Sequence, residues 1–358
     1  MSRALVFFAG KSAMQAIRKD GLHPSMVGAM AGAAGGPKWL VLYGLDRFLF
    51  GQWFSGRSEP LPLVGSSIGS WRFTAASTAD PVSALDRFRE AYLEQSYSAN
   101  PSPQEVTRES LRIFSRFVND EDISAILSNP VFRLNCLAVR CRFLPLQSDN
   151  KPVQVAGLGL SAFFNMFSRA SLAVFFQRTL FYHPAGGPWP VSINGFGYRP
   201  VSLDRDNLRQ AVLASGSIPV VMSGVRDIPG APPGVYRDGG LMDYHVNLPF
   251  SVDDRKIVLF PHYIDRVIPG WFDKKLPWRK PVAKWLDNVL MVAPSPEFVK
   301  SLPFSRIPER RDFAFFQGRD SDRIRFWDDV AKRSLELACE FESVTTSGKI
   351  AELVTQFP

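Results

Sequence analysis

Short apolar runs alternate with helix-forming stretches along the first part of the chain. Three runs have the length and apolar character of buried strands, at residues 4–9, 25–31 and 61–64. A helix-forming stretch follows each of them, at residues 12–19, at 39–50 and, after the turn at 65–70, at 71–78. This repeated order of strand and helix predicts an α/β protein whose central sheet is largely parallel.

The alternation continues until about residue 260. The expected elements are a helical region at 81–127, a strand at 133–144, a helix at 205–213 and a last buried strand at 257–260. Beyond residue 265 the composition changes, and a single amphipathic helix is expected at 325–342. We therefore expect a domain over residues 1–265 and a C-terminal extension over residues 266–358.

One segment approaches the length of a membrane span. Residues 160–181 are rich in phenylalanine and would form a helix of about 33 Å. Arg169 falls near the middle of this segment, and a charged side chain at the centre of a bilayer is costly. We therefore expect an amphipathic helix here, either buried in the protein or lying in a membrane interface.

Composition narrows the classes of protein. The 358 residues are 46% hydrophobic and 21% charged, which excludes extended disorder. Three cysteines and four histidines are too few for a disulfide scaffold or a histidine-rich metal centre, so we expect no metal, no cofactor and a reducing, cytoplasmic location. Lys and Arg exceed Asp and Glu by 42 to 34. The net charge of +8 favours an anionic partner, either nucleic acid or an acidic membrane surface.

The sharpest local pattern is the G-x-S-x-G at residues 65–69, between an apolar run and a helix. A serine on such a strand-to-helix turn is presented as a nucleophile, and the glycines relieve crowding around it. The N-terminus of the following helix also favours developing negative charge. Ser67 is therefore a candidate nucleophile, although an ordinary small-residue turn gives the same pattern.

Two further small-residue loops carry candidate chemistry. Residues 34–39, A-G-G-P-K-W, lie between a strand and a helix, where free backbone N–H groups form an anion cradle or an oxyanion hole. Pro37 has no N–H, which leaves Gly35 and Gly36 as donors. Asp238 is followed by two glycines, so its carboxylate can approach a partner without crowding. Each loop taken alone also fits an ordinary tight turn.

Together the three motifs resemble those of the patatin-like phospholipase family, which has a G-G-G-x-[KR]-G loop, a G-x-S-x-G serine and a D-G-[GA] aspartate in this order. The resemblance covers roughly residues 24–262 and implies a three-layer α/β sandwich. It also implies a metal-independent lipid acyl hydrolase that attacks phospholipid or another acyl ester through an acyl-enzyme. In this reading Ser67 is the nucleophile, Asp238 is its base, and Gly35 and Gly36 form the oxyanion hole.

The loop departs from the family pattern. Ala34 stands at the position of the first glycine, Pro37 at the variable position and Trp39 at the position of the last glycine. Lys38 keeps the basic residue that supports the loop. We expect Trp39 to narrow the site or to re-aim the oxyanion donors. The alternative function is therefore a catalytically compromised protein of the same fold that binds membrane or lipid.

A second catalytic arrangement also fits the order of the residues. In α/β-hydrolases a Ser-Asp-His triad occurs in that order, and His245 or His262 follows Asp238. The D-G-G turn and the long stretch of chain after His262 favour the dyad over this triad.

The last feature is the segment at residues 269–285, PGWFDKKLPWRKPVAKW. Tryptophan prefers the membrane–water interface and clustered cations attract anionic headgroups, so this segment predicts peripheral contact with an anionic membrane. A Pro-rich linker whose tryptophans pack on the core fits equally. Nucleic acid is the weakest candidate partner, because the sequence has no recognised nucleic-acid-binding module. The tryptophans are Trp271, Trp278 and Trp285, and the cations are Lys274, Lys275, Arg279, Lys280 and Lys284.

Overall fold

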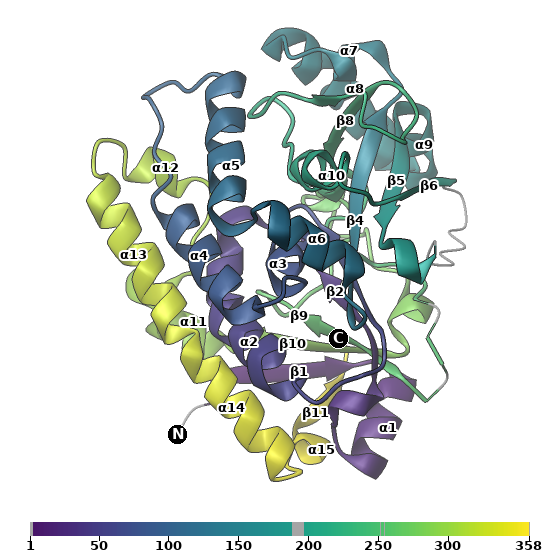
Figure 1. Cartoon of the computed structure of the whole chain (residues 1–358), viewed down its shortest axis with the longest axis vertical. Helices are drawn as coiled ribbons and strands as arrows, with labels where there is room; N and C mark the ends of the chain where they lie inside the picture. The colour runs from purple at the N-terminus through teal and green to yellow at the C-terminus, as the bar shows by residue number, and fades with distance from the viewer. Residues whose placement is uncertain (1–2, 188–196, 251, 254, 358) are drawn as a thin grey trace.

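The chain forms a mixed sheet covered by helices (Figure 1). The computed structural model describes residues 3–187, 197–250, 252–253 and 255–357. Eleven strands pair mostly in parallel in the order β11-β1-β10-β9-β2-β3-β4-β5-β6, with β7 and β8 beside β4. They are β1 (Leu5–Ala9), β2 (Val27–Gly32), β3 (Leu61–Ser66), β4 (Phe132–Cys141), β5 (Phe176–Tyr182), β6 (Tyr198–Ser202), β7 (Val225–Arg226), β8 (Val235–Asp238), β9 (Ile257–Pro261), β10 (Val289–Pro294) and β11 (Val354–Gln356).

The central strands are the apolar runs of the sequence. β2 lies between β9 and β3 and is parallel to both. Strands buried on both faces of a parallel sheet need helices between them in sequence, which explains the alternation. The strands expected at 4–9, 25–31, 61–64, 133–144 and 257–260 are confirmed with shifts of a few residues at their ends.

Helices fill the connections between these strands. They are α1 (Lys11–Asp20), α2 (Tyr43–Phe48), α3 (Ile68–Ala76), α4 (Pro81–Leu93), α5 (Pro103–Phe117), α6 (Asp120–Ser128), α7 (Leu144–Gln147), α8 (Lys151–Phe167), α9 (Leu172–Phe175), α10 (Leu208–Ser215), α11 (Pro296–Ser301), α12 (Asp312–Phe315), α13 (Asp320–Arg333), α14 (Leu335–Thr346) and α15 (Ile350–Leu353). The helical region expected at 81–127 is confirmed as α4 to α6. Asp80, Ser102 and Asn119 cap these three helices with their side chains.

The C-terminal segment 266–358 contributes to the same sheet. β10 lies antiparallel to β1 and parallel to β9, and β11 pairs with β1. β9 is therefore not the last buried strand, which corrects that expectation. α13 and α14 run along the outside of α2 and α4 (Figure 1). Trp327 of α13 is buried in the same apolar core as Phe7 of β1.

The expected helix at 325–342 is two helices that meet at Ser334. The Ser334 hydroxyl donates to the Ala331 carbonyl (2.5 Å) and accepts from the Gly44 N–H (2.8 Å). Ser334 therefore joins the C-terminal helices to α2.

The single helix expected at 160–181 is wrong. α8 ends at Phe167, a short helical turn and α9 follow, and the chain enters β5 at Phe176. β5 pairs with β4 and β6. The buried Arg178 of β5 donates to both carboxylate oxygens of Asp243, at 2.5 and 2.7 Å. Throughout the described ranges, we find no helix with the length and apolarity needed to cross a bilayer.

Candidate active site

Ser67 and Asp238 meet because two strands end against the same stretch of β4. β3 runs parallel to β4 and pairs with it from Phe132 to Leu137. β8 approaches from the opposite direction on the next residues of β4, with Asp238 opposite Ala138. The residue after β3 and the last residue of β8 are therefore adjacent. The Ser67 hydroxyl donates a 2.7 Å hydrogen bond to Asp238 Oδ2.

Ser67 occupies a strained turn between β3 and α3. Its φ of 54° and ψ of −126° lie outside the regions that L-residues favour. A Cβ at Gly69 would lie 2.1 Å from the Gly32 carbonyl oxygen, so only glycine allows this close approach. The Ser67 N–H donates to Ser215 Oγ at 3.0 Å, and that hydroxyl donates to the Leu137 carbonyl at 2.6 Å. Ser215 thus fixes the turn to β4, a role that sequence reasoning missed.

The Asp238 carboxylate is almost completely buried. Its Oδ1 accepts from the Gly240 N–H at 2.7 Å, which leaves Oδ2 for Ser67. Burial raises the pKa of Asp238 from 3.8 to about 6, although the hydrogen bonds from Ser67 and Gly240 oppose the shift. A carboxylate with this pKa is a stronger base than an exposed aspartate and is still ionised at neutral pH.

The small-residue loop faces Ser67 from the other side. Gly36 has a φ of +57°, a left-handed conformation that favours glycine. Gly35 is the N-cap and Gly36 the first residue of a short 3-10 helix, where N–H groups have no intrahelical acceptor. In the described part of the chain nothing accepts a hydrogen bond from either N–H group. Both glycines line a cavity with Ser67 and Asp238, so their N–H groups are available to an oxyanion there.

Trp39 does not narrow the site, contrary to the expectation from its sequence position. Its side chain is fully buried behind the loop, and its ring stacks on Phe88 with centroids 4.4 Å apart. Lys38, by contrast, does line the cavity, and its Nζ lies 5.1 Å from the centre of the Tyr263 ring. Trp39 therefore adds to the apolar core and does not obstruct Ser67.

A chain of hydrogen bonds supports the small-residue loop at Ala34. His245 Nδ1 accepts from the Ile268 N–H at 2.9 Å, so its Nε2 carries the proton and donates to the Tyr263 hydroxyl at 2.8 Å. Tyr263 in turn donates to the Ala34 carbonyl at 2.6 Å. Both nitrogens of His245 are thus engaged away from Ser67. Sequence reasoning placed His245 among the candidate bases and missed its place beneath the loop.

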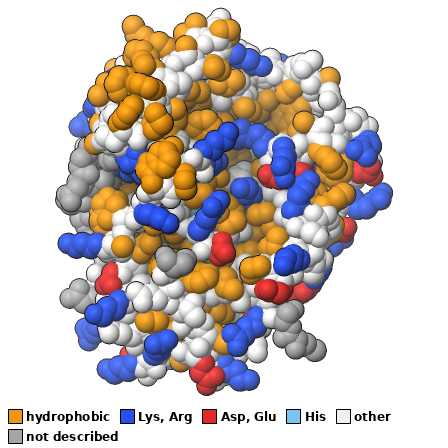
Figure 2. All heavy atoms as spheres, turned by 180° about the vertical axis from the view of Figure 1, so that it is seen from behind, with side chains coloured by type: hydrophobic (Ala, Val, Ile, Leu, Met, Phe, Trp, Pro, Cys, Tyr) orange, Lys and Arg blue, Asp and Glu red, His pale blue; other side chains and the backbone are white. Residues whose placement is uncertain are grey.

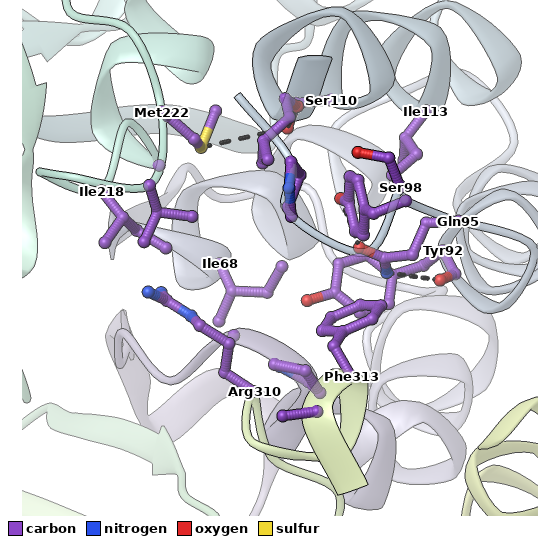
Figure 3. A pocket seen from close by; sticks show the side chains of 18 of the residues that line it. Ile68, Tyr92, Gln95, Ser98, Ser110, Ile113, Ile218, Met222, Arg310 and Phe313 are labelled. Atoms are coloured by element: carbon purple, nitrogen blue, oxygen red, sulfur yellow. Dashed lines mark hydrogen bonds between the residues drawn. The ribbon is translucent and has the colours of Figure 1, made fainter. Parts of the chain in front are cut away.

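Two cavities meet at Ser67. The first, of about 360 Å³, is mostly apolar: Ile218 and Met222 face Tyr92 and Phe313, with Ile68 between them (Figure 3). The second, of about 420 Å³, contains Asp238, Gly35 and Lys38. Ser67, Gly36 and Arg310 line both cavities. Ser67 is therefore accessible from an apolar side and from a polar side.

The polar cavity has an excess of positive charge. Lys38, Lys274 and Arg310 line it, and in the part of the chain that the structure describes none of the three forms a salt bridge. Burial and the charges of Lys38 and Arg310 lower the pKa of Lys274 to about 7. Glu309 lies in the same cavity, where it pairs with Arg311 at 2.5 Å. A bound anion would relieve the repulsion among the three cations.

We compared the sequence with protein-family models and with curated proteins. No protein-family model matches the chain, and a search of curated proteins finds no match. Within the described residues, no group of three or more His, Cys, Asp or Glu side chains is placed to hold a metal ion.

Proposed function

We propose that the protein is a patatin-like serine hydrolase of lipid acyl esters that uses Ser67 and Asp238 as a catalytic dyad. The observation that carries the proposal is the 2.7 Å hydrogen bond from Ser67 Oγ to Asp238 Oδ2, at the junction of two cavities. The match of three motifs in order supports the family, and the mixed, mostly parallel sheet is compatible with it.

In the first half of the reaction, Asp238 accepts the proton of the Ser67 hydroxyl as Oγ attacks the ester carbonyl carbon. The carbonyl oxygen becomes an oxyanion, and the N–H groups of Gly35 and Gly36 stabilise it by about 3 kcal/mol per donor. Collapse of the tetrahedral intermediate breaks the bond to the alcohol oxygen, which takes the proton from Asp238. The products of this half are the free alcohol and the acylated Ser67.

In the second half, Asp238 accepts a proton from a water molecule, and the hydroxide attacks the acyl carbon. The bond to Ser67 Oγ breaks, Asp238 returns the proton to that oxygen, and the carboxylic acid leaves. The dyad performs both halves without a histidine. The hydrogen bonds of His245 support a dyad without histidine, because its two ring nitrogens are bonded to Tyr263 and Ile268.

The two cavities support an ester with unlike ends. The apolar cavity suits the acyl chain, because large apolar side chains dominate its wall. The polar cavity suits a headgroup that is anionic, because Lys38, Lys274 and Arg310 surround it. Phospholipids combine both ends, and we propose them as the substrate class.

A fluorophosphonate probe tests the proposal, since it forms a covalent bond only with an activated serine. We expect labelling of the wild-type protein, hydrolysis of a short-chain ester, and loss of both in Ser67→Ala. Asp238→Asn should abolish hydrolysis with the fold intact by circular dichroism. A wild-type protein that is neither labelled nor active contradicts the dyad. A His245→Ala variant that keeps its fold and is as inactive as Ser67→Ala favours the triad.

A catalytically compromised lipid-binding protein is the second candidate. The departures at Ala34, Pro37 and Trp39 are the observation that favours it. Binding of lipid without probe labelling would support it over the hydrolase.

A further inference from the structure

Exposed apolar side chains are concentrated in one region of the molecule. Among the described residues, fifteen large hydrophobic side chains are exposed, and twelve of them come from residues 144–174 and 271–282. Figure 2 shows apolar side chains gathered over this end of the molecule, with Lys and Arg side chains beside them. Monomeric proteins rarely leave such a concentration of apolar surface in water without a binding role.

Helix α8 is inverted relative to an ordinary surface helix. Its buried positions include the polar residues Gln154, Ser161 and Asn165. Apart from the buried Leu158, its large apolar residues point outward, and Phe163 and Phe167 are 53% and 71% exposed. A helix that turns its polar side to the protein and its apolar side outward is suited to an apolar medium on its outer side.

Polar bonds join this helix to the Trp- and Lys-rich segment. The Asn165 side-chain amide donates to Asp273 Oδ1 at 2.8 Å, and the Arg279 guanidinium donates to the Asn165 carbonyl at 2.5 Å. Asp273 also pairs with Arg169 at 3.4 Å and with Arg279 at 3.3 Å. Two segments about a hundred residues apart in sequence thus form one continuous surface.

The Trp- and Lys-rich segment adds interfacial side chains to that surface. Trp271 and Trp278 are 42% and 60% exposed. Lys275 and Lys280 are exposed as well, whereas Arg279 is committed to Asp273 and Asn165. Apolar side chains prefer the acyl region of a bilayer, tryptophan prefers the membrane–water interface, and lysine is attracted to anionic headgroups. The surface has these three kinds of side chain next to one another.

We propose that this surface, the α8 face, docks on an anionic lipid bilayer. We define it by the exposed side of α8 together with Trp271, Trp278, Lys275 and Lys280. The phenylalanines enter the acyl boundary, the tryptophans lie at headgroup level and the lysines attract anionic headgroups. A second copy of this chain is a poorer occupant, because two faces with the same lysines and a net charge of +8 on each chain repel each other.

Docking on this face brings the candidate active site to the lipid. Leu158 of α8, Trp271 and Lys274 line the polar cavity that contains Ser67 and Asp238. The same two segments therefore form both the docking surface and part of the cavity wall. A lipid headgroup at the docked surface lies beside this entrance, and docking itself does not depend on ester hydrolysis.

Vesicle flotation of the Ser67→Ala protein tests the surface independently of hydrolysis. We expect binding to phosphatidylglycerol vesicles, weaker binding to phosphatidylcholine vesicles, and loss of the difference at high salt because salt screens the lysines. Phe163→Ser with Phe167→Ser should weaken binding to both vesicles by more than about tenfold, since each buried phenylalanine contributes a larger factor than this. Phe315→Ser, at a phenylalanine of α12 that is 54% exposed, is a control outside the α8 face and should bind normally.

The charge contribution has its own pair of variants. Lys275→Gln with Lys280→Gln should remove the preference for phosphatidylglycerol at low salt. Lys11→Gln with Lys19→Gln makes the same charge change on α1, away from the α8 face, and should leave it unchanged. Unaltered flotation of the phenylalanine variant, or no flotation of the parent protein, overturns the proposal. A dimer in light scattering that the same phenylalanine substitutions dissociate, without any vesicle binding, assigns the face to self-association instead.

Discussion

The Tyr263 hydroxyl donates a 2.6 Å hydrogen bond to the carbonyl of Ala34, across 229 residues of sequence. This bond anchors the small-residue loop to Tyr263, which lies two residues after β9. The adjoining Gly35 lies so close to the Tyr263 ring that an added Cβ would be 2.6 Å from it. The position of the proposed oxyanion donors therefore depends on a tyrosine outside the three sequence motifs.

Tyr263→Phe keeps the ring and removes the bond to Ala34. We expect kcat for a short-chain ester to fall about fivefold, which corresponds to about 1 kcal/mol for one neutral hydrogen bond. KM should change little, because the oxyanion interaction develops in the transition state. Tyr43→Phe removes a tyrosine hydroxyl that binds Asp86 instead and serves as the control in steady-state kinetics. A larger change in KM than in kcat would contradict the loop-bracing role.

Gly36→Ala tests the loop directly. The φ of +57° strains any L-residue there, although an added Cβ meets nothing closer than the Tyr92 hydroxyl at 4.0 Å. We expect turnover to fall more than substrate binding, by about tenfold or more, because the N–H donor moves. Gly56→Ala is the control, since its Cβ meets no atom and its φ is unstrained. Unchanged kcat in a folded Gly36→Ala protein would exclude this loop as the oxyanion hole.

Ester hydrolysis should depend on the ionisation of Asp238. The pKa of this carboxyl is raised to about 6 by burial, and only the ionised form accepts a proton from Ser67. We expect kcat/KM for a neutral ester to increase with pH up to about 6 and to level off above it. A pH–rate profile that stays flat from pH 4 to pH 8 would rule out this base.

The same pKa shift predicts that the ionised Asp238 carboxylate lowers the free energy of unfolding. Because its pKa in the folded protein is raised above the ordinary 3.8, its contribution to stability is fully present below about pH 4 and is lost as pH rises through 6. Asp238→Asn should therefore raise the free energy of unfolding at pH 7 by about 2–3 kcal/mol. At pH 4 the gain should nearly vanish. Urea unfolding of both proteins at the two pH values measures this difference, and equal stability at pH 7 would contradict it.

The cations of the polar cavity should select the charge of the ester. Lys274→Gln and Arg310→Gln should each reduce the ratio of kcat/KM for an anionic ester to that for a neutral ester by about fivefold to tenfold. In the wild-type protein this ratio should also fall above pH 7, because the pKa of Lys274 is lowered to about 7 and its charge is lost there. Lys275→Gln, next in sequence but outside the cavity lining, is the control. Equal ratios in all variants would show that these cations do not contact substrate.

The alternation of strands and helices and the order of the three motifs can be read from the amino-acid sequence alone. The apolar runs at the positions of β1, β2, β3 and β9 are nearly continuous. Strands that are buried on both faces of a sheet have this pattern, and it can be recognised before the neighbouring strands are known. The G-x-S-x-G turn is local in part: Gly65 lies against Gly69 and Ser70 of the same turn, whereas Gly69 lies against Gly32 of β2. The motif could be found because its residues are consecutive in sequence, although the contact with β2 could not.

Features that depend on contacts between distant residues became visible in the folded chain. Asp238 reaches Ser67 because β3 and β8 end on adjacent residues of β4, and pairing order is not encoded in either strand. The sequence 160–181 was expected to be one helix because its apolar residues continue, yet the partner strands of β5 ended it. The sequence pattern predicts that Trp39 narrows the site or re-aims the oxyanion donors, whereas its ring stacks on Phe88 of α4 and does not line the cavities at Ser67. The outward side of α8 likewise follows from Asp273, which binds Asn165 and so fixes which side of the helix faces the protein.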